Sequence, residues 1–344
     1  MAADIATVRQ EFYDRISAQN LTPLWTSLAD LVTPEPRSNC RPAAWKFADI
    51  RAAMMEAGGL ISAKEAERRV LILENPGLRG QSRATTSLYA GVQLVLPGEV
   101  APAHRHTQSA LRFVLEGSGA HTAVNGERTM MSEGDFIITP PMTWHDHGNE
   151  SAEPIFWLDG LDIPVVQFLD ASFAEQWHED EQPISRPLGD SGARFGTNLL
   201  PVDYRGGRTS PMFAYPYART RDALEQMRRA AAWDPCHGLK MRYSNPADGG
   251  YAMTTIGTFV QLLPKDFSTA SYRATDATVF APIEGSGRSF VGDTVIEWSK
   301  RDIFVVPSWH KVRHEASEDS VLFSFSDRPI QEALKLFRED RGNL

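Results

Sequence analysis

Cysteine is scarce in this chain of 344 residues, which contains Cys40 and Cys236 and no others. Two cysteines are too few for a disulfide framework, and they are not arranged as a CxxC motif. We therefore expect two ordinary reduced thiols and a fold that depends on its hydrophobic core.

Long apolar runs and clusters of basic residues are also missing. No stretch approaches the roughly 18 consecutive apolar residues that span a membrane, and the first residues lack the basic region and apolar core of a signal peptide. The 35 basic and 44 acidic residues give a net charge of −9, and no basic run is long enough to bind a nucleic-acid backbone. We expect a soluble cytoplasmic protein with neither a membrane nor a nucleic-acid partner.

Apolar residues are plentiful, at 42% of the chain, which is enough for a large core in one or two domains. From Asp4 to about Val32 they recur at helical spacing. A break precedes Pro23, where Thr22 is expected to cap and Pro23 to open a second helix. This segment is expected to be a helical arm.

From about residue 70 the pattern changes to short β-branched and aromatic runs separated by Gly, Pro and Asn, which is typical of a sandwich or barrel. The motifs of this region return later in the chain in the same order. They are VQLVLP (92–97) and VQLLP (260–264), EGSG (116–119) and EGSG (284–287), and GDFII through Trp144-His145 (134–145) and RDIFV through Trp309-His310 (301–310). We interpret this as a duplicated β-domain, in which His310 corresponds to His145.

The same patterns divide the chain into five segments. They are an N-terminal helical arm over 1–65, a first β-domain over 66–175, a linker with a helix from Thr220 to Ala232 over 176–239, a second β-domain over 240–328, and a C-terminal segment over 329–344 with a helix from Ile330 to Glu339.

Three histidines of the first copy have the spacing of metal ligands. His104 and His106 lie two residues apart in an extended segment, so their side chains leave the same face of one strand. His145 comes 39 residues after His106, on a segment that could pair with the first across a barrel. Isolated histidines are more often structural or exposed than ligands, and we expect His121 and His237 to be exposed.

Glycines and prolines surround these histidines: Gly98 precedes His104, while Gly134 and Pro140 precede His145. The pattern resembles the two motifs of the cupin family, a histidine-x-histidine half and a proline-then-histidine half. This resemblance implies a fold of the all-β class with helical additions. It would be a bicupin, with two duplicated double-stranded β-helix (jelly-roll) domains and the N-terminal helical arm.

Two departures from the cupin pattern affect the metal site. Ala110 stands where the family usually has a glutamate ligand, so the three histidines would have no carboxylate beside them. Tyr272 and Ala274 fall where the second copy would carry His104 and His106. We expect the second β-domain to have no metal site and His314 to be structural. Met142, at a position where glycine is common, affects a turn and not the ligation.

Three imidazoles could hold zinc, copper, nickel or ferrous iron, and the type of ligand does not decide between them. Neutral ligands leave the full charge of a divalent metal and several open coordination positions. Such a site suits an anionic chelating substrate together with dioxygen on Fe(II).

The wider sequence resembles the gentisate 1,2-dioxygenases and their salicylate and 1-hydroxy-2-naphthoate relatives. The motifs that carry this resemblance are LTPLW (21–25), AERRVL (66–71) followed by NPG (75–77), PAHRHTQSA (102–110) and WHDHGN (144–149). The resemblance implies a homotetrameric bicupin with one Fe(II) per subunit, held by His104, His106 and His145. Such enzymes use O2 to cleave an aromatic ring between the carboxylated and the adjacent hydroxylated carbon, and gentisate would yield maleylpyruvate in aromatic catabolism.

Three further residues are candidates for binding the substrate. Arg112 lies six residues after His106 in an apolar setting, so it shares the strand face of the ligands and can donate a fork of hydrogen bonds to a carboxylate. Arg68 would add positive charge, although Arg69 competes for this role. Gln93 alternates with apolar neighbours and could face either the substrate or the outside.

Four residues complete the expected site. His147 could assist proton movement at a ring hydroxyl, and Asp159, among apolar neighbours, would orient it. Tyr89 and Gly91 share the strand face of Gln93 by alternation and could shape the wall of the ring pocket, Gly91 by leaving room.

The sequence is also compatible with other functions. The pocket could prefer salicylate or 1-hydroxy-2-naphthoate, because its walls and not the iron ligands would set that choice. A cupin that uses zinc or manganese as a Lewis acid, and a non-catalytic storage or sensing cupin, are alternatives of a different class.

Overall fold

The computed structural model describes residues 4–230 and 232–342. These residues form two compact units, and the boundary along the chain lies between Arg37 and Ser38. The first unit contains helices α1 (Ile5–Ser17) and α2 (Leu24–Leu31), as the apolar spacing predicts. The predicted cap at Thr22 is wrong. Helix α2 begins one residue later than expected, so that Pro23 occupies the N-cap position and no side chain caps the helix.

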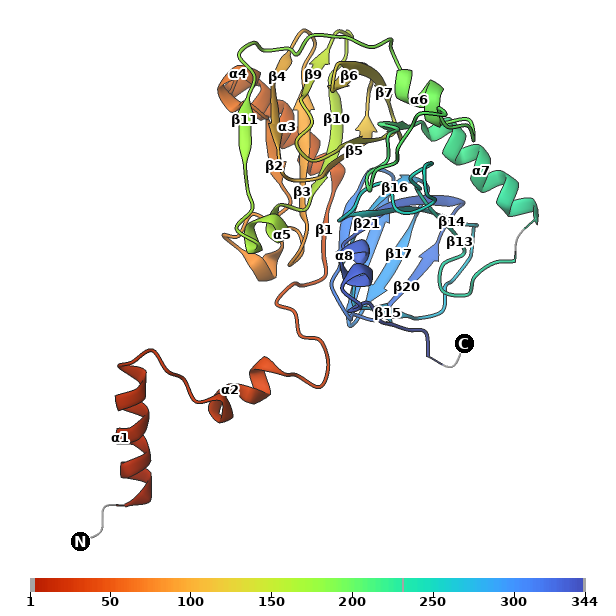
Figure 1. Ribbon diagram of the computed structural model, residues 1–344. Coiled ribbons are helices and arrows are strands. Elements are labelled where there is room, and N and C mark those ends of the chain that lie inside the picture. The colour runs from red at the N-terminus through yellow and green to blue at the C-terminus, as the bar shows by residue number, and fades with distance from the viewer. Residues whose placement is uncertain (1–3, 231, 343–344) are drawn as a thin grey trace. The chain divides into compact units, whose positions relative to one another are not determined.

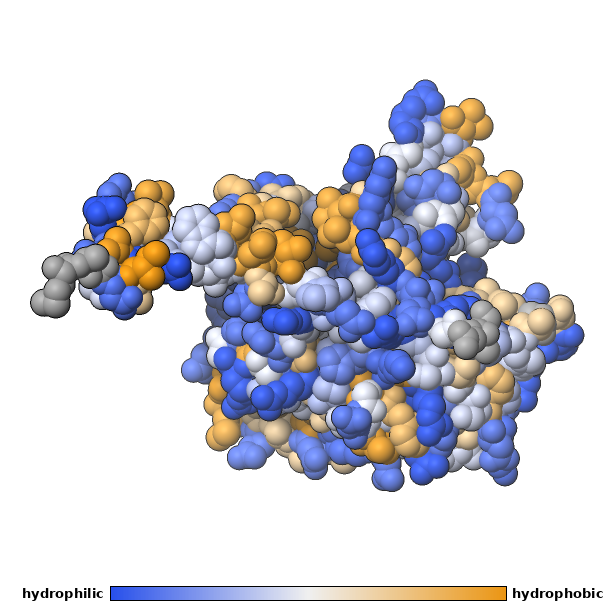
Figure 2. Space-filling model, turned by 90° about the horizontal axis from the view of Figure 1, so that it is seen from below, coloured by the Kyte–Doolittle hydropathy of each residue, from blue (hydrophilic) through white to orange (hydrophobic). Residues whose placement is uncertain are grey.

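The first unit exposes apolar side chains that it does not cover itself (Figure 2). Trp25 is 67% exposed and donates its indole N–H to the Tyr13 hydroxyl at 3.0 Å. Leu24, Leu28 and Leu31 on the same helix are also exposed. Neither these helices nor any other in the described part of the chain is both long and apolar enough to cross a membrane.

The second unit consists of two β-domains joined by a linker (Figure 1). The elements of the first domain and its flanks are β1 (Ala43–Trp45), α3 (Phe47–Leu60), α4 (Ala63–Ala66), β2 (Val70–Ile72), the 3-10 helix η1 (Pro76–Leu78), β3 (Tyr89–Val95), β4 (Val100–His106), β5 (Ala110–Glu116), β6 (Ser118–Val124), β7 (Glu127–Ser132), β8 (Phe136–Thr139), β9 (His145–Asn149), β10 (Ile155–Leu161), α5 (Ile163–Phe168) and β11 (Ala174–Gln176).

The linker and the second domain follow. Their elements are α6 (Asp190–Phe195), β12 (Ala214–Tyr215), α7 (Tyr217–Ala230), β13 (Leu239–Arg242), β14 (Gly257–Leu263), β15 (Arg273–Ala274), β16 (Thr278–Glu284), β17 (Ser286–Val291), β18 (Thr294–Ser299), β19 (Ile303–Val306), β20 (Val312–Ala316), β21 (Ser320–Ser326), α8 (Arg328–Ala333) and β22 (Glu339–Asp340). Helix α7 is the helix expected over 220–232, and it begins three residues earlier.

Each domain is a barrel of two opposed sheets. In the first domain a sheet in the order β12-β8-β5-β10-β3-β2 faces one in the order β11-β4-β9-β6-β7. In the second, a sheet in the order β1-β19-β16-β21-β14-β13 faces β18-β17-β20, and β15 pairs with β22. The two large sheets match strand for strand, which confirms the predicted bicupin with two duplicated jelly-roll domains.

The edge strands β1 and β12 are exchanged between the domains. Strand β1, which precedes the first domain, pairs with β19 of the second, whereas β12, which precedes the second domain, pairs with β8 of the first. Residues 38–65 therefore belong to the compact unit, and the predicted arm over 1–65 is too long. The periodicity of α3 gave no indication that the three-residue strand before it pairs with the far domain.

The largest core lies between the outer faces of the two six-stranded sheets. There the Phe113 ring of β5 stacks on the Phe323 ring of β21, with centroids 4.0 Å apart and an interplanar angle of 4°. The inner faces line two separate barrel interiors. Because these strands are buried on both faces, their sequences are nearly continuous apolar runs, and a polar side chain on an inner face stands out.

The duplication extends past the barrels into the segments that follow them. Helix α5 and strand β11 come after the first barrel, and helix α8 and strand β22 come after the second. The predicted C-terminal helix over 330–339 is therefore wrong: the helix ends at Ala333, and β22 pairs with β15 as β11 pairs with β4. The recurrence of Asp-x-Pro at residues 162–164 and 327–329 is the sequence signal of this repeat.

These two aspartates tie the domains together reciprocally. Asp162 of the first domain accepts the Thr255 hydroxyl of the second at 2.5 Å. Asp327 of the second domain accepts the Ser87 hydroxyl of the first at 2.7 Å. Each carboxylate also accepts a backbone N–H of its own domain. Both are buried, so the hydrogen bonds offset part of the cost of removing them from water.

The contribution of Asp327 to stability should depend on pH. Burial, together with nearby Asp276, raises its pKa from 3.8 to about 6. The folded protein thus binds the proton of Asp327 more tightly than the unfolded chain does. This proton adds on the order of 3 kcal/mol to the free energy of unfolding below about pH 4, and the contribution is lost as the pH rises through about 6. Asn cannot titrate. The Tm of wild type minus that of Asp327→Asn should therefore fall between pH 5 and pH 7.5.

The exposed Thr294 is the control, because neither threonine nor alanine titrates and the Tm difference between wild type and Thr294→Ala should be the same at both pH values. A difference for Asp327→Asn that did not change with pH would contradict the linkage.

Candidate metal centre

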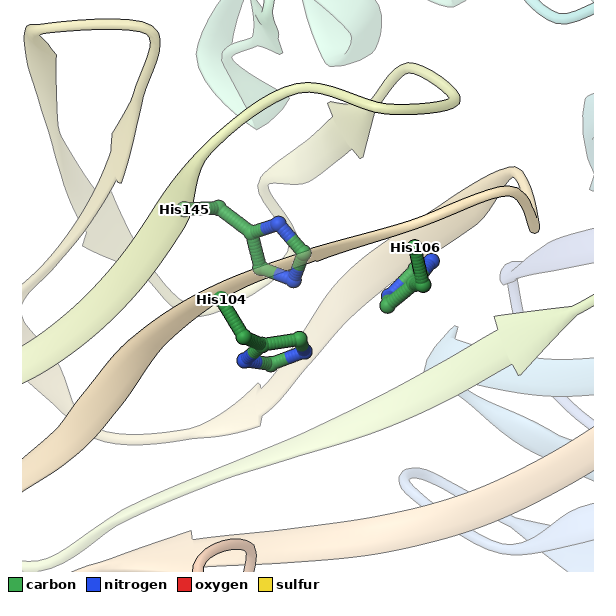
Figure 3. Close-up of side chains that lie close together, drawn as sticks. All are labelled: His104, His106 and His145. Atoms are coloured by element: carbon green, nitrogen blue, oxygen red, sulfur yellow. The ribbon is translucent and has the colours of Figure 1, made fainter. Parts of the chain in front are cut away.

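Three imidazoles from two neighbouring strands point toward one another in the first barrel (Figure 3). His104 and His106 lie on β4, and His145 begins β9, which pairs with β4 so that His104 faces His145 across the ladder. Ring centroids are 4.3 to 5.3 Å apart, and one nitrogen from each ring lies within 4.8 Å of the other two. The structure therefore brings the predicted ligands together.

The turn before β9 delivers His145 to this position. Pro140 ends strand β8, and the chain reverses through Met142, whose φ of 57° is rare for a residue with a side chain. The Met142 N–H donates to the carbonyl of His106 at 2.7 Å, which joins the turn to the strand of the other two ligands. This is the position where the sequence departs from glycine, and the turn forms without it.

Each imidazole has one nitrogen close to a backbone carbonyl. The Nδ1 atoms of His104, His106 and His145 lie 3.3, 3.0 and 3.0 Å from the carbonyls of Pro102, Gln108 and Thr143. In His106 and His145, an Nδ1–H that donates to the carbonyl leaves the lone pair on Nε2, which is the usual second shell of a metal-binding histidine. Nε2 of His145 is buried and has no hydrogen-bond partner.

The environment keeps all three rings neutral. Burial, and then the charges of Arg68 and His106, lower the pKa of His104 to about 2. Burial and Arg112 lower the pKa of His106 to about 4, and burial and His104 hold the pKa of His145 well below 6.5. Neutral imidazoles that converge on one point, one of them with an orphaned buried nitrogen, fit a divalent transition metal.

Arg68, not Arg69, belongs to the site. Nη2 of Arg68 contacts Nδ1 of His104 and donates to the Pro102 carbonyl at 2.6 Å. Arg69 is 4% exposed and forms a two-pronged ion pair with Glu99, both at 2.7 Å, away from the histidines. Both arginines lie in the irregular segment between α4 and β2, where no periodicity of the sequence predicts which side chain reaches the histidines.

Arg112 and Asp159 form a buried pair beside the histidines. Arg112 is 4% exposed, its Nε lies 3.7 Å from Oδ1 of Asp159, and its Nη1 donates to the Thr139 hydroxyl. Burial raises the pKa of Asp159 to about 6, although Arg112 and the Trp157 indole N–H at 3.0 Å both oppose the rise. Nε of Arg112 forms no hydrogen bond and faces Asp159, so the attraction between these two groups is that of an ion pair.

His147 is fully buried next to this pair, but its predicted partner is wrong. Its Nδ1 lies 3.0 Å from the Thr122 hydroxyl, directly across the β6–β9 ladder, whereas Asp159 binds Trp157 and Arg112. Burial, followed by Arg112, holds the pKa of His147 well below 6.5, and its Nε2 has no partner. The second barrel repeats this hydroxyl–imidazole contact, between Ser289 and Nδ1 of His314. An alignment of the two copies of the repeat would therefore have identified Thr122 as the partner of His147.

The remaining three candidates lie on the inner face of β3. Gln93 is 2% exposed and its Nε2 has no partner, which settles its orientation as inward. Tyr89 is half-buried, and burial and Asp159 raise the pKa of its hydroxyl. The room that Gly91 leaves is taken by Tyr89 and Val70, because a Cβ there would lie 2.8 Å from the Tyr89 hydroxyl and 2.6 Å from Val70 Cγ1.

In the second barrel Tyr272 and Ala274 stand at the places of His104 and His106, but one predicted correspondence was wrong. Tyr272 bridges Val312 as His104 pairs with His145, so Val312 and not His310 corresponds to His145. The Trp-His dipeptides of the two copies are two positions out of register. His314 corresponds to His147, and Ser289 lies across from it as Thr122 lies across from His147.

His121 and His237 were expected to be exposed and are buried. The segment after β11 covers His121, since Gln182 there bonds both Asp146 and the backbone of β6. His121, Asp146 and Glu181 bring ligand atoms within 4.8 Å of one another. Glu181 is already paired with an arginine, so the cluster is an ion-pair network at the surface of the barrel.

Comparisons with known proteins agree with this geometry. A family model described as "Cupin domain" matches residues 91–161. The gentisate 1,2-dioxygenase 1 of Aquipseudomonas alcaligenes is 61% identical over 97% of this chain and 96% of its own length. This chain belongs to the gentisate 1,2-dioxygenase family.

Two more similar proteins are named as 1,2-dioxygenases of other substrates. The 1-hydroxy-2-naphthoate 1,2-dioxygenase of Nocardioides sp. (strain KP7) is 36% identical over 98% of this chain and 89% of its own length. A solved structure of salicylate 1,2-dioxygenase from Pseudoaminobacter salicylatoxidans, described as an adduct with gentisate, has a TM-score of 0.94. It is 34% identical and covers all of this chain and 96% of that one.

Loss of one imidazole should empty the metal site. After anaerobic loading with Fe(II), His145→Ala should retain less than about a tenth of the wild-type iron per chain, because two ligands without the third bind weakly. His310→Ala should retain the full amount, since His310 lies outside the ligand set. Metal analysis of the desalted proteins measures both. Equal loss in the two variants would contradict the register given above.

Substitution of Gly91 should disturb the inner wall of the site. In Gly91→Ala the new Cβ would force Val70 and Tyr89 to move, and overpacking of this kind costs about 1–3 kcal/mol. Gly59→Ala is the control, because nothing lies within 4 Å of the added Cβ on helix α3 and alanine favours a helix. Urea unfolding should give opposite signs for the two variants. A Gly91→Ala protein as stable as wild type would show that Tyr89 is not held as described.

Proposed function

We propose that this protein is an Fe(II)-dependent gentisate 1,2-dioxygenase. It converts gentisate (2,5-dihydroxybenzoate) and O2 to maleylpyruvate in aromatic catabolism, with one iron per subunit held by His104, His106 and His145. The observation that carries this proposal is the convergence of three neutral imidazoles, without a carboxylate, beside the buried guanidinium of Arg112.

The donor set supports iron with an anionic substrate. Three neutral ligands leave the charge of the metal uncompensated, so a substrate that brings its own negative charge is favoured over water. When bound, Fe(II) supplies the redox chemistry that dioxygen requires, and the protein supplies position and charge.

The side chains of the pocket carry a net positive charge, because Arg68 and Arg112 outnumber the one carboxylate, Asp159. The buried guanidinium of Arg112 supplies positive charge for the substrate carboxylate, while Asp159 beside its Nε and the Thr139 hydroxyl at its Nη1 hold it in place. Arg68 adds a second charge next to His104. In this arrangement Asp159 positions Arg112, and it is not the orienting partner of His147.

His147 and Gln93 are the polar groups for the ring hydroxyls. His147 is neutral, and its unpartnered Nε2 can take up the proton that a hydroxyl gives up when the substrate binds, with Thr122 fixing the ring. Gln93 has a free amide N–H on the same inner face. Tyr89 and Gly91 shape the wall beside them, with the Tyr89 hydroxyl lying over Gly91.

Gentisate is the preferred substrate in this proposal for two reasons. The relative from Aquipseudomonas alcaligenes, which is 61% identical to this chain, is named as a gentisate dioxygenase. The solved salicylate 1,2-dioxygenase is described as an adduct with gentisate. In addition, the hydroxyl para to the first one makes the ring of gentisate more electron-rich than that of salicylate, and so easier to cleave.

We further propose a cytoplasmic homotetramer. Members of this family usually assemble in this way, and the exposed apolar side chains of α2 are suited to burial against another subunit.

Oxygen uptake tests the proposed function. The protein, loaded with Fe(II) under anaerobic conditions, should consume one O2 per gentisate and form maleylpyruvate, and salicylate should react more slowly. The protein loaded with zinc should consume no O2, which separates a dioxygenase from a Lewis-acid cupin. Uptake that did not depend on both iron and gentisate would overturn the proposal, and faster cleavage of salicylate would overturn the substrate preference alone.

A further inference from the structure

The second barrel has lost its metal ligands but not its polar interior. Gln261 occupies the place of Gln93, as the repeated VQL motif and the strand register show, and His314 occupies the place of His147. Tyr272 replaces His104. A barrel with a purely structural role would be expected to fill this space with apolar side chains.

Lys240 is the main addition to this interior. It lies on β13 directly opposite Gln261, where the first barrel has Val70 opposite Gln93. Within the described residues its ammonium forms no hydrogen bond or ion pair, and its Nζ lies 4.9 Å above the ring of Phe259. Burial, and then the charge of Arg328, lower the pKa of Lys240 to about 8. An unpaired, half-buried cation is costly unless an anion comes to it.

Three other side chains of the second barrel carry buried polar atoms without hydrogen-bond partners. Gln261 is completely buried, and neither its Nε2 nor its Oε1 is hydrogen-bonded. His314 is also completely buried, with Nδ1 on Ser289 and Nε2 free. The Ser324 hydroxyl on the adjacent inner face is a third such group. Native proteins rarely leave several buried donors unsatisfied in one place.

A cavity of about 480 Å³ opens onto Lys240. Aromatic rings form part of its wall, since Phe259 and Tyr251 both line it. Three arginines also line the cavity, together with Glu332 and Glu339. Arg328 pairs with Asp276 at 3.1 Å and Arg341 pairs with Asp234 at 3.0 Å, while Arg242 donates to the Gly249 carbonyl and lies over the Tyr251 ring. Among these cations Lys240 is the one that, within the described residues, has neither a hydrogen bond nor an ion pair, and the ring of Phe259 lies beside it.

We propose that this cavity is a second ligand site, which binds a small aromatic carboxylate with Lys240 as the counter-ion. The carboxylate meets the ammonium and the donors opposite it, and the ring packs against Phe259 and Tyr251. The site contains no metal ligand set and does not depend on the catalytic chemistry of the first barrel.

The probe 4-bromobenzoate tests this proposal, because anomalous scattering locates its bromine in crystals of the full-length protein. A bromine next to Lys240, separate from any in the first barrel, is the expected result. Calorimetry on the metal-free protein should show this binding weakened at least about tenfold in Lys240→Met. Lys265→Met, which removes an exposed lysine of the same domain, should bind as wild type does.

Stability measurements separate a lost ligand site from a damaged fold. Lys240→Met removes an unpaired charge, so its Tm without ligand should equal or exceed that of wild type. Gln261→Leu provides a second variant and should also weaken binding. No bromine in the second barrel, water alone at Lys240, or affinity unchanged in both variants would overturn the proposal.

Discussion

The face-to-face packing of the two six-stranded sheets is the constraint on which the site depends. The stacked rings of Phe113 and Phe323 belong to a core that buries the outer faces of both sheets. Strand β5 therefore cannot rotate or slip without exposing that core, since a slip of one residue would reverse every side chain. Arg112, the neighbour of Phe113, is fixed on the opposite face and points into the barrel.

The two copies of the duplicated fold differ in the side chains of their barrel interiors. The first barrel places three neutral imidazoles and a buried guanidinium around one point, and the second keeps the same polar positions without the ligands. Exchanged edge strands and the paired bonds of Asp162 and Asp327 hold the two copies in register. The fold thus supplies rigid inner faces, and a few side chains decide what each face binds.

Features with a local cause could be read from the sequence. The spacing of His104 and His106 and the inward position of Arg112 follow from the period of a strand, and the bicupin fold follows from the repeated motifs. Features that depend on cross-strand register could not. The partner of His147 is Thr122 because β6 pairs with β9 at that level, and His310 was matched to His145 because identical dipeptides masked a two-residue shift.

We propose that three imidazoles of the first barrel, and no protein carboxylate, hold the iron. X-ray absorption at the iron edge of the anaerobic Fe(II) protein, with and without gentisate, measures this directly. We predict three imidazole nitrogens at about 2.1 Å in both states, with two oxygens of gentisate added in the second. Fewer than three imidazoles, or a protein carboxylate in the first shell, would contradict the account.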